Sequence, residues 1–339
     1  MYAAVFYNQH DIRYEKINIP KISSDEILLE TKICGLCGSD LVKIKNNQLK
    51  PSTVIGHEVA GIIKECGNNV IEFKKGDRVV VAHHTPCFNC HYCFHENYSM
   101  CRHFKNINFV PGAFSQFIKI PSELVKNTTF KIPDSLSFEK AVFTEPLACC
   151  LKAIKKANLH KNDTVVILGL GSIGLLLTQL CKVFNFNTIG IDLKVDRLEL
   201  ANSLGARFTI NAMSPDLKEQ ILKITNNIGA DLVILAAESS KTFYTSMDIV
   251  RDGGKICVFS SIPPMEKIEL DFNSIYYKEI CIYGSYSPDP IDLKNSLELI
   301  IKEDIKLEPL ISKIFPLEKI KEAIALALNK KFIKILLRP

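Results

Sequence analysis

The most informative stretch of the sequence is residues 164–174, which read Thr-Val-Val-Ile-Leu-Gly-Leu-Gly-Ser-Ile-Gly. Its aliphatic start predicts a buried strand over Thr164–Leu168, and the glycine pattern that follows opens a helix predicted over Ile173–Phe184. In a G-x-G-x-x-G turn, the first glycine makes the tight turn, the second lets the backbone approach a pyrophosphate, and the third lets the helix pack on the strand. Free N–H groups at the helix N-terminus attract the phosphates. This stretch therefore predicts a dinucleotide-binding site at Gly169, Gly171, Ser172, Ile173 and Gly174.

A carboxylate at the end of the next predicted strand, Thr188–Asp192, extends this prediction. Asp192 is placed to accept hydrogen bonds from both ribose hydroxyls of the dinucleotide and to repel a 2′-phosphate, which favours NAD over NADP. Arg197 is a further candidate for cofactor binding, and the basic Arg197 and Lys194 leave binding of NADP open. The alternative interpretation is a glycine-rich turn in a sheet protein with an incidental aspartate at a strand end.

Strands and helices alternate around this stretch, from about Leu151 to Ser285, which predicts a parallel sheet covered on both faces in a doubly wound Rossmann domain. The first 150 residues instead contain short predicted strands separated by glycine turns. The fold class is therefore α/β, with a β-rich domain over 1–150, a Rossmann domain over 151–285 and a C-terminal segment over 286–339. The remaining predicted strands are Ile27–Ile33, Val59–Glu65, Arg78–Ala82, Phe208–Ile210, Leu232–Ala236, Ile256–Ser260 and Ile280–Tyr283, with helices Val195–Leu204 and Leu293–Ile301 and a last helix–strand unit over Leu317–Leu337.

The composition is that of a globular chain of about two domains, with 339 residues, 47% hydrophobic, 23% charged and a formal net charge of +5. These fractions exclude a disordered or fibrous protein. Because the basic residues are scattered, we expect no nucleic-acid partner. The uncharged stretch Thr164–Cys181 approaches the length of a membrane span, but its glycines and the lack of a basic flank favour a strand, turn and helix. We therefore expect no membrane partner.

The twelve cysteines indicate metal binding rather than a disulfide scaffold, because such scaffolds are usually short and secreted. Residues Met1–Tyr14 lack the basic start and apolar run of a secretory signal. We therefore expect reduced thiols and a cytoplasmic location.

Four cysteines lie in a long loop between Ala82 and Val110 and follow the pattern C-x2-C-x2-C-x7-C. Four thiolates at this spacing can surround one tetrahedral Zn²⁺, with sulfur about 2.3 Å from the metal. An iron–sulfur cluster is disfavoured because the common cluster pattern ends in C-x3-C-P. A nucleic-acid-binding zinc ribbon would require a basic stripe that the loop lacks, and four unrelated thiols would not cluster in this way. The predicted zinc ligands are Cys87, Cys90, Cys93 and Cys101.

Three further segments carry a thiol, an imidazole and carboxylates: Cys37-Gly-Ser-Asp40, Gly56-His57-Glu58 and Glu145-Pro146. Taken singly, they read as a buried thiol, a core histidine and a capping glutamate. Taken together, they provide nitrogen, sulfur and oxygen donors for a zinc ion that keeps one coordination position open, as catalytic zinc requires.

In combination and order, these motifs resemble the zinc-dependent medium-chain dehydrogenases, with the greatest likeness to the polyol (sorbitol-like) and threonine dehydrogenase branches. The resemblance spans residues 1–339 and includes Gly76-Asp-Arg-Val79, Phe315-Pro-Leu-Glu318 and Lys334-Ile335. It implies a GroES-like catalytic domain over 1–150 with a structural zinc loop over about 83–103, and a Rossmann domain, with the active site in the cleft between them. It also implies that residues 286–339 return to the catalytic domain and that the protein is a homodimer or homotetramer.

The resemblance also implies roles for individual residues. Cys37 and His57 are implied as catalytic zinc ligands, Glu58 as a permanent or switchable ligand, and Glu145 as a carboxylate that acts directly or through water. Ser39 is placed to accept the proton of the substrate hydroxyl, although a hydroxyl that only satisfies a turn is the alternative. The implied catalytic residues are Ser39, Cys37, His57 and Glu58, and the implied structural zinc ligands are Cys87, Cys90, Cys93 and Cys101.

Two positions qualify the resemblance. Relatives often have a histidine as the outer end of the proton relay where this chain has Val42, so the relay beyond Ser39 is not assigned. His84 aligns with a histidine that threonine dehydrogenases use near the substrate, and an ordinary loop histidine bonded to backbone is an equal alternative.

The implied activity is hydride transfer from a secondary alcohol to NAD, with zinc acting as a Lewis acid on the substrate oxygen. The implied substrate is a small alcohol: a polyol, a sugar derivative or a 3-hydroxy amino acid. The alternatives are an L-threonine 3-dehydrogenase and a non-catalytic NAD-binding protein that kept the fold.

Overall fold

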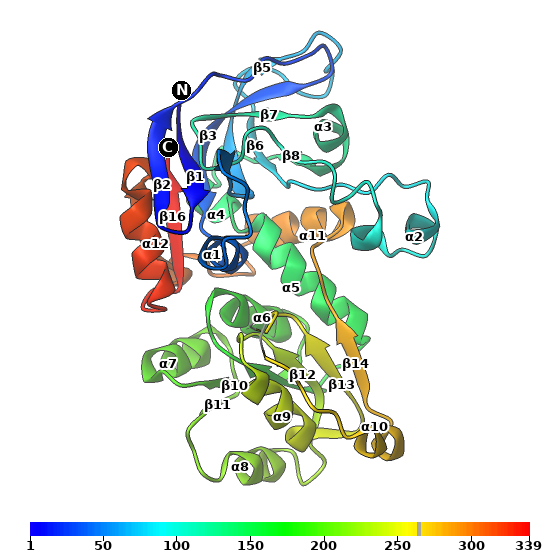
Figure 1. Ribbon diagram of the computed structural model, residues 1–339. Helices are drawn as coiled ribbons and strands as arrows, with labels where there is room; N and C mark the ends of the chain where they lie inside the picture. The colour runs from blue at the N-terminus through cyan, green and yellow to red at the C-terminus, as the bar shows by residue number, and fades with distance from the viewer. Residues whose placement is uncertain (263–265) are drawn as a thin grey trace. The chain divides into compact units, whose positions relative to one another are not determined.

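Six parallel strands form the sheet of the unit made of Cys149–Ser287 and Asp304–Lys306 (Figure 1). The order is β11-β10-β9-β12-β13-β14, and every neighbouring pair is parallel. The predicted doubly wound sheet is thus confirmed, and its winding reverses between β9 and β12, where such sheets bind ligands at the carboxyl ends of their strands. The strands are β9 (Thr164–Leu168), β10 (Asn187–Asp192), β11 (Phe208–Asn211), β12 (Ala230–Leu235), β13 (Val250–Val258) and β14 (Cys281–Gly284).

Helices connect these strands, and consecutive strand residues are buried, so both faces of the sheet are covered. The uncharged stretch Thr164–Cys181 is β9, a turn and most of α6, as predicted, and in the described part of the chain no helix is long and apolar enough to cross a membrane. Helix α7 ends at Gly205, which has a φ of +117°. The helices are α6 (Ser172–Val183), α7 (Val195–Leu204), α8 (Leu217–Ile224), α9 (Ser240–Ile249) and α10 (Phe272–Lys278).

Strand β13 begins at Val250, six residues before the predicted start at Ile256. The glycines Gly253 and Gly254 suggest a turn in the sequence. In the structure the ladder with β12 continues across them through an irregularity in register, so that Ala230 pairs with Val250 and Leu232 with Lys255. Tertiary pairing therefore overrides the local turn signal at this position.

The other unit is β-rich and consists of Met1–Ala148, Pro288–Glu303 and Leu307–Pro339. Its larger sheet has the order β15-β16-β3-β5-β6-β8, with β7 also paired to β3, and a smaller sheet has the order β2-β1-β4. The C-terminal strand β16 pairs antiparallel with β3, so the end of the chain completes a sheet begun by its first 35 residues. The sequence predicts domain boundaries at 150 and 285, whereas the structure divides the chain at 148 and 287.

The computed structural model describes residues 1–262 and 266–339 of the protein. The strands of the β-rich unit are β1 (Tyr2–Asn8), β2 (Asp11–Lys16), β3 (Ile27–Gly35), β4 (Thr53–Val54), β5 (Glu58–Cys66), β6 (Arg78–Val81), β7 (Phe117–Ile120), β8 (Thr129–Lys131), β15 (Ile311–Pro316) and β16 (Lys334–Arg338). Its helices are α1 (Gly38–Lys45), α2 (His91–Phe94), α3 (Ser122–Thr128), α4 (Phe138–Ala141), α11 (Pro290–Ile301) and α12 (Ile320–Leu328), while α5 (Thr144–Ala157) contains the unit boundary.

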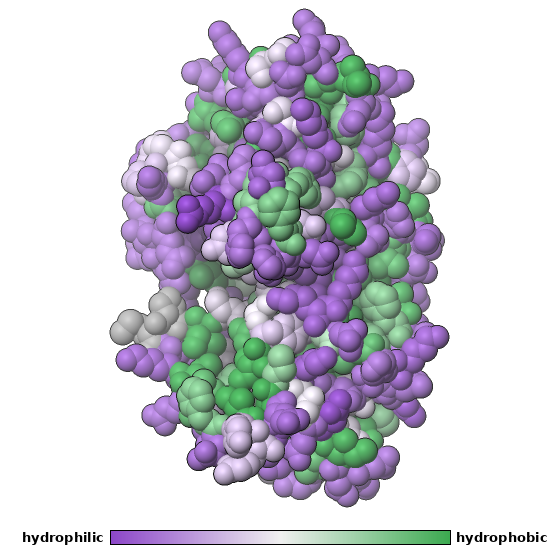
Figure 2. Space-filling model, turned by 90° about the vertical axis from the view of Figure 1, so that its right-hand side faces the viewer, coloured by the Kyte–Doolittle hydropathy of each residue, from purple (hydrophilic) through white to green (hydrophobic). Residues whose placement is uncertain are grey.

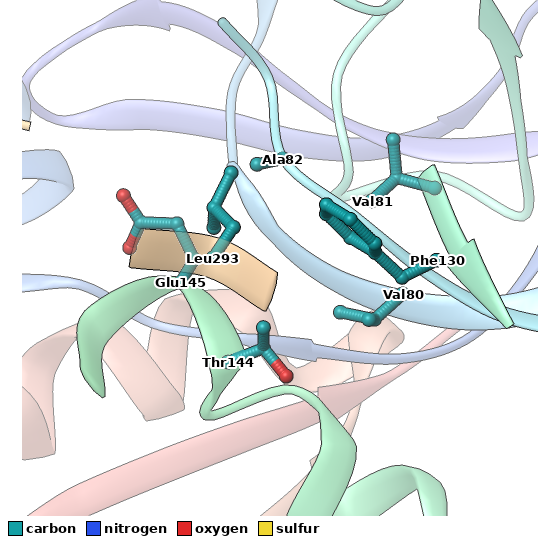
Figure 3. A pocket seen from close by; sticks show the side chains of 7 residues that line it. All are labelled: Val80, Val81, Ala82, Phe130, Thr144, Glu145 and Leu293. Atoms are coloured by element: carbon teal, nitrogen blue, oxygen red, sulfur yellow. The ribbon is translucent and has the colours of Figure 1, made fainter. Parts of the chain in front are cut away.

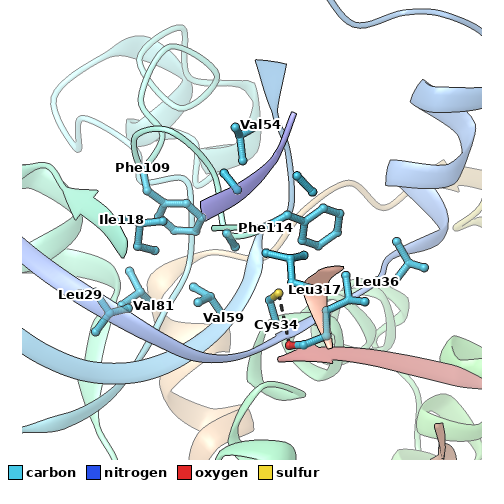
Figure 4. Close-up of a cluster of buried hydrophobic side chains, with 14 of the residues drawn as sticks. Leu29, Cys34, Leu36, Val54, Val59, Val81, Phe109, Phe114, Ile118 and Leu317 are labelled. Carbon is cyan, nitrogen blue, oxygen red and sulfur yellow. Dashed lines mark hydrogen bonds between the residues drawn. The ribbon is translucent and has the colours of Figure 1, made fainter. Parts of the chain in front are cut away.

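The core of the β-rich unit lies against β3 and β5 (Figure 4). Leu29, Val59 and Ile118 come from three paired strands and are fully buried, together with Phe114 from the segment before β7. The Cys34 thiol donates a hydrogen bond to the Leu337 carbonyl over 3.6 Å, which links β3 to β16 beside this core. Cys37, at the N-cap of α1, and Glu58, the first residue of β5, lie at element ends beside this packed region.

Candidate functional site

The glycine-rich turn joins β9 to the N-terminus of α6. Gly169 has a φ of +104°, and a Cβ on Gly174 would lie 1.9 Å from the Gly169 carbonyl oxygen, so a larger residue at 174 would disrupt the turn. The Ser172 hydroxyl, at the first position of α6, is buried and has no hydrogen-bond partner among the described residues. Free helix N–H groups beside an unsatisfied hydroxyl fit the phosphates of a dinucleotide.

Asp192 lies beside this turn at the end of β10. Its Oδ2 accepts a hydrogen bond from the Leu170 N–H over 2.7 Å, and its Oδ1 accepts one from the Lys194 N–H over 3.0 Å. The Arg197 guanidinium also approaches the turn, with Nη1 3.4 Å from the position that a Cβ on Gly171 would occupy. The structure thus brings together the predicted cofactor-binding residues Gly169, Gly171, Ser172, Ile173, Gly174, Asp192 and Arg197.

Cys37, His57 and Glu58 form the first of two groups of metal-ligand candidates in the described residues. One donor atom from each lies within 4.8 Å of the other two. Cys37 is the N-cap of α1, whereas His57 and Glu58 lie at the start of β5. The Ser39 hydroxyl is exposed and donates a hydrogen bond to the Cys37 sulfur over 3.4 Å. One sulfur, one nitrogen and one oxygen around a common point fit a zinc ion with a free coordination position.

Asp40 orients this group, a role that the sequence does not reveal although Asp40 belongs to the Cys37–Asp40 motif. Its carboxylate is 1% exposed, with Oδ1 3.3 Å from His57 Nδ1 and Oδ2 accepting the Cys37 N–H over 3.3 Å. Burial alone would lower the pKa of His57, but the Asp40 carboxylate and the Cys37 thiolate raise it well above its usual range. Because Asp40 holds Nδ1, the His57 Nε2 is left as the donor atom for a metal.

Lys334 is a second residue whose role the sequence does not reveal. It begins β16, and its ammonium lies 2.6 Å from Glu58 Oε1 and 2.5 Å from Glu58 Oε2, with both side chains buried. Burial alone would lower the pKa of Lys334, but the charges of Glu58, Cys37 and Glu145 raise it. The sequence separation of the two residues explains why the pair is not predictable: only the pairing of β16 with β3 brings them together.

Glu145 lies at the N-terminal turn of α5 and is 6% exposed. It is not part of the three-residue group within 4.8 Å, although its charge acts on Lys334. A small apolar cavity, without room for a water molecule, lies beside it and is lined by Val80, Phe130 and Leu293 among others. Figure 3 shows the Glu145 carboxylate at one side of this cavity, directed away from the Phe130 ring. The geometry therefore ranks Glu58 ahead of Glu145 as a direct ligand.

Two neighbouring histidines lie against the same group. The His83 ring centroid is 4.7 Å from that of His57 and 3.7 Å from that of His84. His84 Nδ1 is 2.9 Å from the Ile107 carbonyl oxygen, and burial lowers the pKa of His84 to about 4. His84 therefore has the backbone partner that the loop interpretation expects, while His83 lies between His84 and the metal-ligand candidates.

Cys87, Cys90, Cys93 and Cys101 form the second group of metal-ligand candidates. Their sulfur atoms lie 3.5 to 3.9 Å apart in the three closest pairs. Sulfur atoms at about 2.3 Å from a tetrahedral zinc ion are about 3.8 Å from one another, so the cluster fits this metal. Burial alone would raise the pKa of Cys101, but the backbone N–H groups of Cys87 and Phe104 lower it to about 6. The backbone thus already favours a thiolate at this position.

Comparisons with known proteins identify the family of the chain. A model of the alcohol dehydrogenase GroES-like domain matches residues 23–134, and a model of the zinc-binding dehydrogenases matches residues 172–302. Sorbitol dehydrogenase from Bacillus subtilis (strain 168) is 33% identical over 349 residues, covering 100% of this chain and 97% of the relative. D-Arabitol-phosphate dehydrogenase from Enterococcus avium is 32% identical over 328 residues, covering 95% and 92%.

Among solved structures, galactitol-1-phosphate dehydrogenase from Escherichia coli has a TM-score of 0.88 and 27% identity, covering 100% of both chains. The resemblance stated from the sequence motifs is confirmed by these matches, which extend over the whole chain. The chain belongs to the zinc-dependent medium-chain alcohol and polyol dehydrogenases, a family of enzymes.

Proposed function

We propose that this enzyme oxidises a secondary hydroxyl of a polyol or polyol phosphate and transfers the hydride to NAD. The observation that carries the proposal is the group formed by Cys37, His57 and Glu58, whose donor atoms lie within 4.8 Å of one another. The relatives named for sorbitol and for D-arabitol phosphate support a polyol as the substrate class. L-Threonine is the second candidate, because the His84 ring contacts the His83 ring, which in turn contacts His57.

Zinc and NAD, when bound, supply Lewis-acid polarisation of the alcohol oxygen and the hydride acceptor. Cys37, His57 and Glu58 would hold the catalytic zinc, with Glu145 as an additional carboxylate from α5. Asp40 holds the His57 ring through Nδ1, so that Nε2 would be the atom that binds zinc. Cys87, Cys90, Cys93 and Cys101 would hold a structural zinc that orders their loop.

Ser39 is the proposed first carrier of the substrate's hydroxyl proton. Its hydroxyl is exposed and lies 3.4 Å from the Cys37 sulfur, so it is close to the proposed metal position and to solvent. Because position 42 is a valine, the proton passes from Ser39 to water rather than to a histidine at that position.

The proposed cofactor is NAD rather than NADP. The Asp192 carboxylate is held at the glycine-rich turn by two backbone N–H groups, and its remaining lone pairs are available to ribose hydroxyls. A 2′-phosphate at this position would face a fixed negative charge.

The test is NAD⁺ reduction with a panel of polyols, polyol phosphates and L-threonine, before and after removal of zinc by chelation. We expect turnover with at least one polyol or polyol phosphate, loss of that turnover without zinc, and recovery when zinc is returned. Turnover that survives complete removal of zinc contradicts the proposed chemistry, and turnover with L-threonine alone favours the second candidate.

The enzyme is also proposed to form a homodimer, or a tetramer built from such dimers. Strand β14 is the edge of the six-stranded sheet, and the neighbouring α10 leaves Phe272, Tyr276 and Tyr277 between 74% and 79% exposed. Figure 2 shows apolar side chains gathered on the lower part of the face that contains these elements. An uncovered sheet edge beside exposed aromatic rings is typical of a surface that a second copy covers.

Replacing Tyr276 and Tyr277 by aspartate tests this assembly by analytical ultracentrifugation. We expect the double variant to sediment as a monomer, whereas Ile71→Asp, at a 92% exposed position of the other unit, sediments as wild type. A monomeric wild-type protein, or an unchanged double variant, contradicts the proposed surface.

A reducing compartment, the cytoplasm, is the proposed location. None of the twelve cysteines, all of them among the described residues, forms a disulfide in the structure, and the proposed zinc sites require thiolates that an oxidising compartment would convert to disulfides.

A further inference from the structure

The Glu58–Lys334 ion pair is built from three neighbouring strands of the β-rich unit. Glu58 begins β5 and lies opposite Gly35, the last residue of β3, which in turn lies opposite Leu336 of β16. A Cβ on Gly35 would lie 1.8 Å from Glu58 Oε2 and 3.1 Å from Lys334 Cε. Glycine at position 35 therefore provides the space in which the two charged side chains meet.

This ion pair is not explained by stability. The Lys334 and Glu58 side chains are 4% and 0% exposed, and moving two charges out of water costs several kcal/mol per ion, which their attraction only partly offsets. Apolar side chains of similar size at the two positions would often stabilise a fold as well or better. A buried pair that is costly to form and lies next to a candidate metal ligand indicates a role in the metal site.

The charges around the site suggest what that role is. The negative charges of Glu58, Cys37 and Glu145 all act on Lys334. A carboxylate that donates fully to the metal reduces the polarisation that the metal provides as a Lewis acid. Through its two short contacts, Lys334 would compete with a bound metal for the lone pairs of Glu58.

We propose that Lys334 is a positioning residue that restrains Glu58, weakening its bond to the metal and keeping a coordination position open for the substrate alcohol. The inference rests on the metal site of the proposed function. A carboxylate that accepts a hydrogen bond from a ligand histidine raises the basicity of that histidine. By the same reasoning, a cation paired with a ligand carboxylate lowers the basicity of that carboxylate. Removal of the Lys334 charge therefore strengthens donation from Glu58.

The experiment compares the wild type with Lys334→Met after cobalt has replaced zinc in the Cys37–His57 site, with zinc retained in the four-cysteine cluster. We expect Lys334→Met to show the weaker visible absorption of a higher coordination number and to release its metal about 10-fold more slowly. We also expect kcat to fall more than KM rises, because Glu58 then occupies the position that the substrate needs. Lys334→Arg, which keeps the charge, is the matched control and should retain the wild-type spectrum.

A purely structural role for Lys334 gives a different pattern. In that case Lys334→Met lowers the thermal stability of the metal-free and metal-loaded protein equally and leaves the cobalt spectrum unchanged, which overturns the proposal. If Lys334→Met does not fold, Lys334→Gln, which can still donate a hydrogen bond to Glu58, should shift the spectrum in the same direction. In a Glu58→Gln background, a second substitution at Lys334 should leave the spectrum unchanged, and a further shift contradicts action through Glu58.

Failure of the inference can be distinguished from failure of the proposed function. If the wild type binds no metal at Cys37 and His57, the proposed function fails. If the wild type binds metal and turns over a polyol but Lys334→Met has the same spectrum and release rate, only the inference about Lys334 fails.

Discussion

The two groups of metal-ligand candidates in the β-rich unit differ in how the chain builds them. The four cysteines come from one segment, residues 87–101, and are brought together by short turns around α2. Cys37 and the pair His57–Glu58 come instead from a helix N-cap and the start of a strand, and their buried partners Asp40 and Lys334 lie on α1 and β16. One group is local and the other depends on the tertiary structure.

This difference matches the chemistry of each group. Four thiolates complete a tetrahedron and leave no position for a substrate, so the ion that they bind contributes to folding. A thiolate, an imidazole and a restrained carboxylate leave one coordination position open. Other residues must then fix these three ligands in place. The comparison predicts that substitutions in one group change turnover and substitutions in the other change stability.

The largest expected effect is on turnover at the mixed group. Cys37→Ser or His57→Ala should lower kcat/KM by about 1,000-fold or more, because a Lewis acid supplies several kcal/mol of transition-state stabilisation. NAD binding, measured by NADH fluorescence titration, and thermal stability should remain close to wild type. Loss of NAD binding in both variants would show that the two sites are wrongly assigned.

The next effect is on stability at the four-cysteine group. Cys93→Ser should lower the free energy of unfolding by about 3 kcal/mol. This is a part of the roughly 10 kcal/mol or more that structural zinc supplies to small domains that depend on it. For a domain of this size the Tm falls by about 6 to 12 °C, as measured by calorimetry, with one zinc ion fewer per chain. Cys66→Ser, outside both groups, is the control. Unchanged stability and zinc content in Cys93→Ser would contradict a structural role for the four-cysteine group.

Asp40→Asn should lower kcat/KM by about 10- to 100-fold, the usual effect of losing the partner of a ligand histidine. The asparagine keeps the size of the buried side chain but not the charge that faces His57 Nδ1 over 3.3 Å. Metal analysis at equal zinc concentration should show weaker retention of the catalytic zinc with the four-cysteine zinc unchanged. Equal loss of both ions would indicate a general folding defect.

The smallest expected effect is at Ser39. Ser39→Ala should lower kcat by about 10-fold, which is less than the usual contribution of a positioned proton carrier, because water can replace an exposed hydroxyl. Solvent-isotope effects on kcat should change with the variant, while thermal stability does not. A kcat equal to that of the wild type would favour the interpretation in which Ser39 only satisfies a turn.

The parts that could be predicted from the sequence share one property: their signals are contiguous. The strand, glycine turn and helix at 164–183 and the four cysteines at 87–101 appear in the structure close to where the sequence places them. The start of β13 was wrong by six residues, because Gly253 and Gly254 look like a turn until β12 is available to pair with them.

The roles of Asp40, Lys334 and Gly35 could not be predicted, since each exists only through a partner elsewhere in the chain. Asp40 requires His57, 17 positions away, and Lys334 requires Glu58, 276 positions away. In the sequence, Gly35 resembles the other glycines that mark turns. The requirement for glycine at this position is visible only in the structure, where Glu58 and Lys334 pack over it.

The sequence by itself determined the fold class, the glycine-rich turn, the four-cysteine cluster and the set of candidate donor atoms in the mixed group, because local geometry and side-chain chemistry suffice for each. The tertiary structure alone decided how those donor atoms are oriented and restrained, because the strand order β16-β3-β5 brings the last residues of the chain to Glu58. Because Lys334, Glu58 and Asp40 are buried, their charges interact with neighbouring groups more strongly than they would in water.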